Sequence, residues 1–399
     1  MDRKVVFKFG ARAPEAITYL KGLLANFGQQ SQIEFEYDVF PNESEYSELV
    51  LTTLHGYPLD VVELGTTFVR DFLVANDLRP FRATEVQQVG RSEDFMSHLW
   101  QAGEDKRAKW AIPWLSDVRL LFYRRDLLEK AGVDEETAFN TPAEFEQTLA
   151  SLQEAGVDIP WACATERNLL AIHCLLSWAW HRGGKFVDET KQKVLLDSPE
   201  IVAAMQDYFG LYRFFGKARQ SGQDFNAFDA FIRGHAAVTV GGPWAFPLMH
   251  DSPDVLARTG VAPVLGHSFV GGSCLGIWKQ SYHEQAAVDT IRYLTGPEFQ
   301  SHFPQYIGML PGRLDALATY PLPKEGFRPS LQRALQNGLE LPAFSRWGLV
   351  ESRLATAIAR VWHDILAHPD PDINALVATH MAATTRRINA LLAQHVAAG

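Results

Sequence analysis

Residues 5–40 read VVFKFGARAPEAITYLKGLLANFGQQSQIEFEYDVF, and their pattern decides the fold class. Val5 to Phe9 and Ile33 to Phe40 have the apolar and β-branched character of strands. Pro14 to Asn26 lies between them, begins with a first-turn proline and places apolar residues at helical spacing. A strand–helix–strand unit with short loops predicts a mainly parallel sheet covered by helices, which is an α/β fold.

The alternation continues along the chain. Further strands are predicted at 59–64, 117–123, 236–240, 260–264 and 273–278. Helices are predicted at about 44–54, at 125–131, from 142, from 199 and over the last hundred residues. Because the strands predicted after residue 260 return to the opening domain, we expect the chain to cross between two lobes more than once. The predicted lobes are 1–116 with about 262–315, and 117–261 with about 316–399, with hinge segments near 115–120, 260–266 and 310–320.

Composition excludes several classes of protein. Of the 399 residues, 47% are hydrophobic and 21% charged, which is ordinary for a globular protein. The net charge of −10 and the lack of a basic stripe argue against a nucleic-acid partner. Cys163, Cys174 and Cys274 fit neither a disulfide framework nor a zinc pattern, and we expect Cys163 and Cys174, which lie in an apolar stretch, to be buried free thiols. No apolar run reaches the length of a membrane span, and Met1–Lys4 leads directly into a strand without a signal-peptide segment.

Motifs for catalysis are missing from the sequence. It contains no His-Glu-x-x-His pair, no Gly-x-Ser-x-Gly elbow, no P-loop and no dinucleotide fingerprint. A glycoside hydrolase needs two carboxylates at a fixed separation, and nothing in the sequence links Asp117 to Glu63. We therefore expect a binding protein with no catalytic residues, no cofactor and no metal.

Several segments, in order, carry a family resemblance. Residues 112–133, IPWLSDVRLLFYRRDLLEKAGV, show a proline, an aspartate, an aliphatic–tyrosine strand and a helix ending in Lys-Ala-Gly. Residues 231–244, FIRGHAAVTVGGPW, show Gly-x-Ala-Ala followed by Gly-x-Trp. Residues 271–277, 286–295 and 308–313 follow at the family's separations. With these segments the chain resembles the family 1 extracellular solute-binding proteins, the maltose-binding-like group of ABC importers.

The resemblance implies a bilobal periplasmic-binding-protein fold of type II, two α/β lobes joined by a multi-strand hinge. It implies capture of a small polar solute, most simply a mono- or oligosaccharide, in the interlobe cleft and delivery to membrane permease subunits by hinge closure. A monomer in the periplasm or outside the cell is expected. A ligand-sensing domain that reports to a signalling receptor is the alternative, and a carbohydrate-active enzyme is a weaker one.

Ligand contacts are expected first at aromatic and polar residues near strand ends. Trp244 follows a Gly-Gly-Pro turn, where its ring would either stack on a sugar or pack in the core. The resemblance places Asp117 at a position that accepts hydroxyl hydrogen bonds, with turn capping as the alternative. Its neighbour Trp114 is either a ligand contact or hinge packing. Gly271 and Gly272 would permit close backbone approach, although a plain turn also uses glycine.

The remaining candidates rest on topology or on the resemblance. Arg346 and Trp347 lie where the family brings an arginine or aromatic into the cleft. Arg12 and Thr66 follow the first and third strands, where ligands of α/β sheets bind. Arg313 would be a ligand clamp or, preferably, a surface ion pair. We expect the apolar segment containing Trp178, Trp180 and His181 to pack in the core.

Overall fold

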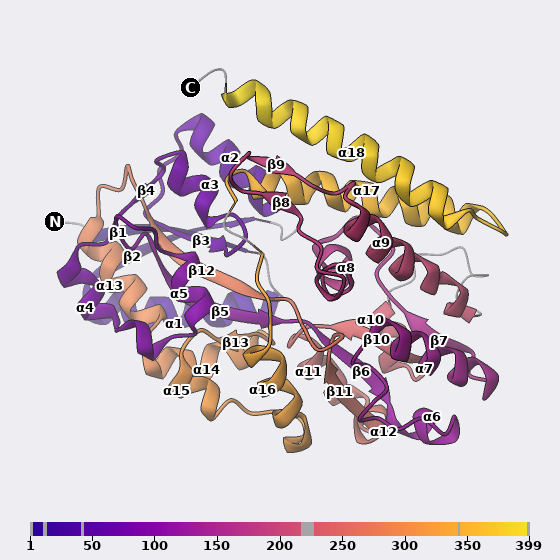
Figure 1. Cartoon of the computed structure of the whole chain (residues 1–399). Helices are drawn as coiled ribbons and strands as arrows, with labels where there is room; N and C mark the ends of the chain where they lie inside the picture. The colour runs from indigo at the N-terminus through magenta and orange to yellow at the C-terminus, as the bar shows by residue number, and fades with distance from the viewer. Residues whose placement is uncertain (1–2, 11–13, 41–43, 217–226, 342–343, 397–399) are drawn as a thin grey trace. The chain divides into compact units, whose positions relative to one another are not determined.

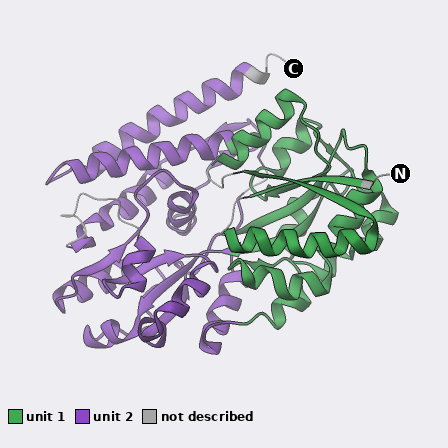
Figure 2. Cartoon of the chain, turned by 180° about the vertical axis from the view of Figure 1, so that it is seen from behind, with its two compact units in different colours: residues 1–117, 271–321, 345–348 green, residues 118–270, 322–344, 349–399 purple. Residues whose placement is uncertain are grey.

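The computed structural model describes residues 3–10, 14–40, 44–216, 227–341 and 344–396. The chain separates into two compact units, green and purple in Figure 2. Unit 1 comprises residues 1–117, 271–321 and 345–348, and unit 2 comprises residues 118–270, 322–344 and 349–399. The chain therefore passes from one unit to the other more than once.

Unit 1 is built on a seven-stranded sheet with the order β13-β5-β12-β3-β1-β2, in which β4 pairs with β12 (Figure 1). The strands are β1 (Arg3–Gly10), β2 (Ile33–Phe40), β3 (Val61–Gly65), β4 (Leu78–Arg79), β5 (Ala111–Val118), β12 (Val270–Trp278) and β13 (Leu310–Pro311). β1 runs parallel to both β2 and β3, as the opening stretch predicts. β12 is antiparallel to β3, so a strand contributed from late in the sequence breaks the parallel pattern.

Helices cover this sheet. They are α1 (Pro14–Ser31), α2 (Glu45–His55), α3 (Val69–Val74), α4 (Ala83–Val89), α5 (Ser97–Ala102), α13 (Glu284–Leu294), α14 (Pro297–Tyr306) and α15 (Leu314–Ala318). One core cluster joins Phe7 of β1 to apolar residues of α1, α13 and α14. A second cluster joins Val62 of β3 to Phe68 and Phe72 at α3. The inner strands β3, β5 and β12 are buried along almost their whole length, whereas β2 at the edge of the sheet alternates apolar with charged residues.

Unit 2 contains a four-stranded sheet with the order β11-β6-β10-β7. Its strands are β6 (Leu120–Arg124), β7 (Ile159–Ala162), β10 (Ala236–Gly241) and β11 (Thr259–Pro263), and β8 (Val187–Asp188) pairs with β9 (Lys193–Val194) separately. β10 is parallel to β7 but antiparallel to β6, and β6 is antiparallel to β11. The parallel arrangement predicted from the opening strands therefore holds for β1, β2 and β3, whereas in unit 2 β6 runs antiparallel to both of its neighbours.

The helices of unit 2 cover this sheet and form the C-terminal part of the chain (Figure 1). They are α6 (Arg125–Lys130), α7 (Pro142–Glu154), α8 (Leu169–His181), α9 (Pro199–Gly210), α10 (Ala227–Ile232), α11 (Ala245–Leu248), α12 (Pro253–Arg258), α16 (Arg328–Gln336), α17 (Trp347–Ala367) and α18 (Ile373–Val396). α7 begins as its capping sequence predicts, with the Thr141 hydroxyl accepting the Glu144 backbone N–H at 3.2 Å. Within the described residues, none of the helices combines the length and apolar character needed to cross a bilayer.

The observed boundaries differ in detail from the expected ones. The predicted strand at 117–123 is two strands, β5 and β6, and unit 1 gives way to unit 2 after Asp117, at the end of β5. The return to unit 1 comes at Gly271 rather than at about 262. Phe269 stays with unit 2 because its carbonyl accepts the Arg119 N–H at 2.9 Å and its backbone pairs with Leu339. The short segment 345–348 was not anticipated. The three cysteines are buried and free, which confirms the expectation for Cys163 and Cys174.

Candidate functional site

Two parallel strands of unit 2 end side by side. β7 and β10 pair in register from Ala236 with Ile159 to Thr239 with Ala162, so their carboxyl ends lie at the same edge of the sheet. Residues 163–168 follow β7, and Gly242, Pro243 and Trp244 follow β10. Ligands of α/β sheets bind outside the carboxyl ends of strands, so this edge is the first place to look for a site.

A pocket of about 610 Å³ lies at this edge. Its walls come from the loop after β7, from α10 and from the start of α11; the lining residues are Ala164, Thr165, Glu166, Asn168, Leu170, Ala227, Phe228, Asp229, Ile232, Trp244 and Leu248. Trp244 is half-buried, and its ring meets the ring of Phe228 edge-on, with centroids 5.0 Å apart and planes at 70°. An aromatic corner of this kind leaves part of the indole open to the pocket.

Gly242 makes room for the Trp244 ring. A Cβ at this position would lie 2.6 Å from Trp244 Nε1 and 2.8 Å from Arg119 Nη1, which is closer than side-chain atoms approach. The glycine therefore lets the indole fold back over its own turn, against the buried Arg119 guanidinium. Any larger residue here would displace one of these two groups.

Arg119 belongs to a buried polar group beneath the turn. Its Nη2 donates to His173 Nδ1 at 2.9 Å, and the His173 ring stacks on Phe269 with centroids 3.9 Å apart. His173 Nε2 lies 3.6 Å from Glu351 Oε1 of α17. Burial, followed by the Arg119 charge, holds the pKa of His173 well below its usual range, so the imidazole is neutral. This group fixes Arg119, and Arg119 in turn supports the position of the Trp244 turn.

The polar side chains that line the pocket are two carboxylates, an amide and a hydroxyl. Glu166 is exposed, and Asp229 is half-buried with Arg233 Nε 2.8 Å from its carboxylate. Asn168 caps α8 by accepting the Ala171 N–H at 2.8 Å, which fixes the loop between them. Carboxylates beside an aromatic face suit a ligand with hydroxyl groups around an apolar ring. Among the described residues, no group of three or more His, Cys, Asp or Glu side chains is arranged to hold a metal.

In unit 1 the structure gathers some of the predicted residues at the carboxyl ends of β1 and β3. Thr66 follows β3, and its N–H donates to the Gly272 carbonyl at 2.9 Å. The Gly10 N–H donates to the buried Glu63 carboxylate at 2.9 Å. Gly271 O lies 3.4 Å from His98 Nε2, and burial lowers the pKa of His98 to about 4. Arg12, at the end of β1, lies outside the described residues.

Gly272 has a structural reason to be glycine. Its φ is +142°, and a Cβ would lie 2.1 Å from the carbonyl oxygen of Leu115 in β5. The close approach that this glycine permits is therefore to the neighbouring backbone of unit 1. This observation supports the plain structural alternative for Gly272, and ligand contact by Gly271 and Gly272 stays a prediction.

Trp114 and Arg313 lie inside unit 1. Trp114 is fully buried and stacks on Phe303 with centroids 5.9 Å apart and planes at 10°, which agrees with the packing alternative. Arg313 forms the preferred ion pair, with Nη2 2.8 Å from Asp315, but its guanidinium is buried over the Phe95 ring and not on the surface. Asp117 is half-buried at the end of β5, and a ligand contact there stays a prediction.

Trp347 is the first residue of α17, and Arg346 directly precedes the helix. Asp71 of α3 accepts the backbone N–H groups of Arg346, Trp347 and Gly348, the last two at 3.2 and 3.1 Å. Burial raises the pKa of Asp71 to about 6, while these backbone hydrogen bonds oppose the shift. The Trp347 side chain is fully buried, so in this structure it presents no open ring for stacking. Arg346 is half-buried with a φ of +68°.

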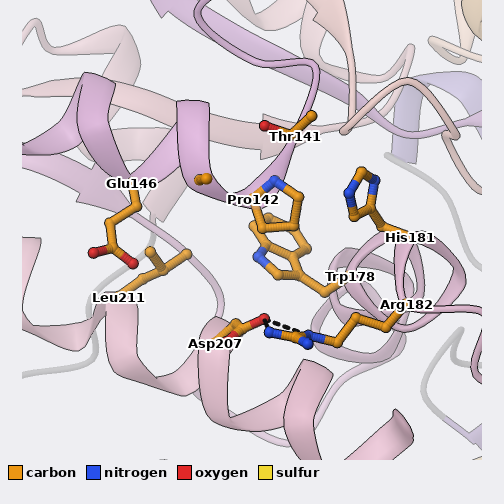
Figure 3. Close-up of a pocket in the computed structure, with 9 residues that line it drawn as sticks. Thr141, Pro142, Glu146, Trp178, His181, Arg182, Asp207 and Leu211 are labelled. Atoms are coloured by element: carbon orange, nitrogen blue, oxygen red, sulfur yellow. Dashed lines mark hydrogen bonds and ion pairs between the residues drawn. The ribbon is translucent and has the colours of Figure 1, made fainter.

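A second pocket of unit 2, of about 500 Å³, lies between α7, α8 and α9 (Figure 3). Its charged side chains pair with one another or with neighbours: Arg182 Nε lies 2.6 Å from Asp207, and Glu146 pairs with Arg213. Trp178 beneath it is buried as expected, but Trp180 is half-buried and His181 is exposed at the rim. Core packing was therefore the wrong expectation for His181, because α8 ends there and turns its last residue outward.

Several pocket residues were missed from the sequence: Thr165, Glu166, Asn168, Phe228 and Asp229. A usable signal was present for the first three. The polar run Thr165–Asn168 stands between an apolar strand and an apolar helix, which is the pattern of a loop at a strand's carboxyl end. Phe228 and Asp229 lie on the short helix α10, whose sequence has no pattern that indicates a binding site.

A family model connects the chain to known proteins. The model described as "Bacterial extracellular solute-binding protein" matches residues 13–301. A "Probable ABC transporter-binding protein" of Deinococcus radiodurans is 24% identical over 278 residues, 63% of this chain. The same match spans 63% of that relative, which is less than two thirds of its length.

Solved structures share the fold over nearly the whole chain. Maltose-bound MalE3 of T. maritima has a TM-score of 0.76 and 26% identity, covering 95% of this chain and 99% of that one. An ABC transporter solute-binding protein from Thermotoga lettingae, bound with alpha-D-tagatose, has a TM-score of 0.80 and 20% sequence identity. The match covers 98% of this chain and 100% of that one. The sugar-binding protein MalE from Xanthomonas citri has a TM-score of 0.78 and 23% sequence identity, and the match covers 98% of each chain. These likenesses confirm the predicted fold class, two α/β units of the periplasmic-binding-protein type.

Proposed function

Because the chain belongs to the bacterial extracellular solute-binding protein family, we propose that it is the substrate-binding component of an ABC importer and that its ligand is a mono- or oligosaccharide. The observation that carries the sugar assignment is the pocket at the ends of β7 and β10, where Trp244 and Phe228 stand beside Glu166 and Asp229. A sugar ring presents C–H groups on its faces and hydroxyls on its rim, and this pocket offers a partner for each.

The similar proteins support this ligand class. MalE3 of T. maritima is described as maltose-bound, and the Thermotoga lettingae protein is described as bound with alpha-D-tagatose. We propose that this chain likewise binds its ligand without changing it chemically, as a monomer, and hands it to permease subunits from a periplasmic or extracellular position. The repeated passage of the chain between its units supports a hinge, and we propose that hinge closure accompanies capture.

A panel of ligands tests the proposal. Thermal melting and intrinsic tryptophan fluorescence would be recorded with mono- and oligosaccharides, amino acids, short peptides and polyamines. A ligand that binds only the native state raises the melting temperature, and at about 100 times its Kd it stabilises by about 2.7 kcal/mol. We expect at least one sugar to shift both signals. If a peptide or polyamine shifts them while every sugar fails, the sugar assignment is wrong and the family assignment stands.

A further inference from the structure

A groove runs between α17 and α18 in unit 2, and its lining residues are different from those of the pocket at the ends of β7 and β10. The two helices lie side by side in Figure 1, and His380 Nε2 of α18 lies 2.8 Å from Asp364 Oδ2 of α17. The groove has a volume of about 640 Å³. Its lining residues are Arg353, Thr356, Ala357, Arg360, Thr379, His380, Ala383, Thr384, Arg387, Ile388, Ala390 and Leu391.

Three arginines line this groove, and along its length they come alternately from α17 and α18. Arg353 and Arg360 are two helical turns apart on the same face of α17, about 10 Å along its axis. The helices are antiparallel, because a short connection joins them and residue 364 meets residue 380. This register places Arg387 of α18 on the opposite wall, at a level between Arg353 and Arg360. The cationic groups are therefore spread along the groove and do not converge on one point.

These arginines carry uncompensated charge. In the part of the chain that the structure describes, Arg353, Arg360 and Arg387 are exposed and have no carboxylate partner. A fourth, Arg167, reaches α17 from the loop after β7 and is held by hydroxyls alone, with Nε 3.1 Å from Thr356 and Nη2 3.0 Å from Ser352.

Several other arginines of unit 2 are paired with carboxylates, although the exposed Arg333 and Arg386 also have no carboxylate partner among the described residues. Arg182 pairs with Asp207, Arg233 with Asp229 and Arg328 with Glu325. In a chain with a net charge of −10, four arginines that have no carboxylate partner among the described residues gather beside this one groove, and this local positive charge favours an anionic occupant.

We propose that the α17–α18 groove docks an acidic segment of a partner protein. Each guanidinium is a planar fork that binds a carboxylate through two hydrogen bonds, and the spacing of about 10 Å requires several carboxylates on one extended chain. The exposed or half-buried apolar residues Ala383, Ala390 and Leu391 also line the groove, and they suit the methylene groups and backbone of a peptide better than an inorganic anion. The inference does not depend on which solute the protein carries.

A peptide titration on the full chain tests the groove. Fluorescein-labelled hexaglutamate would be titrated by anisotropy, with hexaglutamine as the neutral control. We expect hexaglutamate to bind, and to bind more weakly as salt is raised, because exposed charge pairs are screened. Replacing Arg353 and Arg387 together with glutamine should weaken binding about tenfold or more, the scale of interface arginines. The matched control, Arg233→Gln with Arg328→Gln, removes the same charge at paired sites and should change the Kd less than about twofold.

The possible outcomes separate the proposal from its rivals. Melting temperatures of the variants show that they fold, and Arg360→Gln repeats the test on the other end of the groove. Failure of the wild type to bind hexaglutamate overturns the proposal. An equal loss in the control pair overturns it too, because binding would then follow net charge. Groove-dependent binding of tripolyphosphate or of anionic phospholipid vesicles, without binding of hexaglutamate, assigns the groove to phosphate groups and rejects the peptide.

Discussion

Replacing Trp244 with alanine is expected to weaken sugar binding by about 1–3 kcal/mol, a factor of roughly 5 to 150 in Kd. The half-buried indole forms an open aromatic corner with Phe228 and lines the pocket at the ends of β7 and β10. Its removal takes away the flat face on which a sugar ring would stack. Isothermal titration calorimetry with the sugar found in the panel measures the change.

The conservative variant Trp244→Phe serves as the control. It keeps an aromatic face but loses area, so we expect an affinity between those of the wild type and Trp244→Ala. Thermal melting without ligand would show only a small change for either variant, because the ring is half exposed. An unchanged Kd combined with a large drop in melting temperature would show that Trp244 is a packing residue and would remove it from the site.

Replacing Trp114 with alanine is expected to lower the free energy of unfolding by about 3–5 kcal/mol. The ring is fully buried, stacks on Phe303 and meets Phe7 edge-on with centroids 5.9 Å apart. Alanine would leave a cavity in the main core of unit 1, between the sheet and α14. Denaturant unfolding followed by circular dichroism measures the loss.

Trp114 was a ligand candidate from its place beside Asp117, so its variants also discriminate between two roles. Trp114→Phe fills much of the cavity and should cost less stability than alanine. We expect the phenylalanine variant to bind sugar with nearly the wild-type Kd. A stable Trp114→Phe protein with a Kd raised more than about tenfold would contradict the packing assignment.

The fold could be predicted because its signals are local. Strand-like residues at 5–9 and 33–40 with a helical pattern between them determine a parallel β1–β2 pair, and the structure shows it in full register. The Thr141-Pro142 start of α7 and the Ser198-Pro199 start of α9 are equally local, since each cap lies within three residues of the N–H it accepts. The burial of Cys163 and Cys174 follows from the apolar stretch in which they lie.

The site was less predictable because it depends on pairing between distant segments. Trp244 stood out through its own turn, but Glu166 and Asn168 join it only because β7 pairs with β10, about 75 residues further along. The burial of Trp347 depends on Asp71, which binds the start of α17 from a helix far away in sequence. No periodicity in one sequence reports such contacts.

Hydrogen–deuterium exchange with and without the sugar found in the panel tests the central claim most directly, because it shows where the ligand binds unit 2. We expect slower exchange in residues 164–170 and 242–248, the two segments after β7 and β10 that contribute lining residues to the pocket. Unchanged exchange in both segments at saturating sugar, with protection confined to other parts of unit 2 such as the pocket of Figure 3, would contradict it.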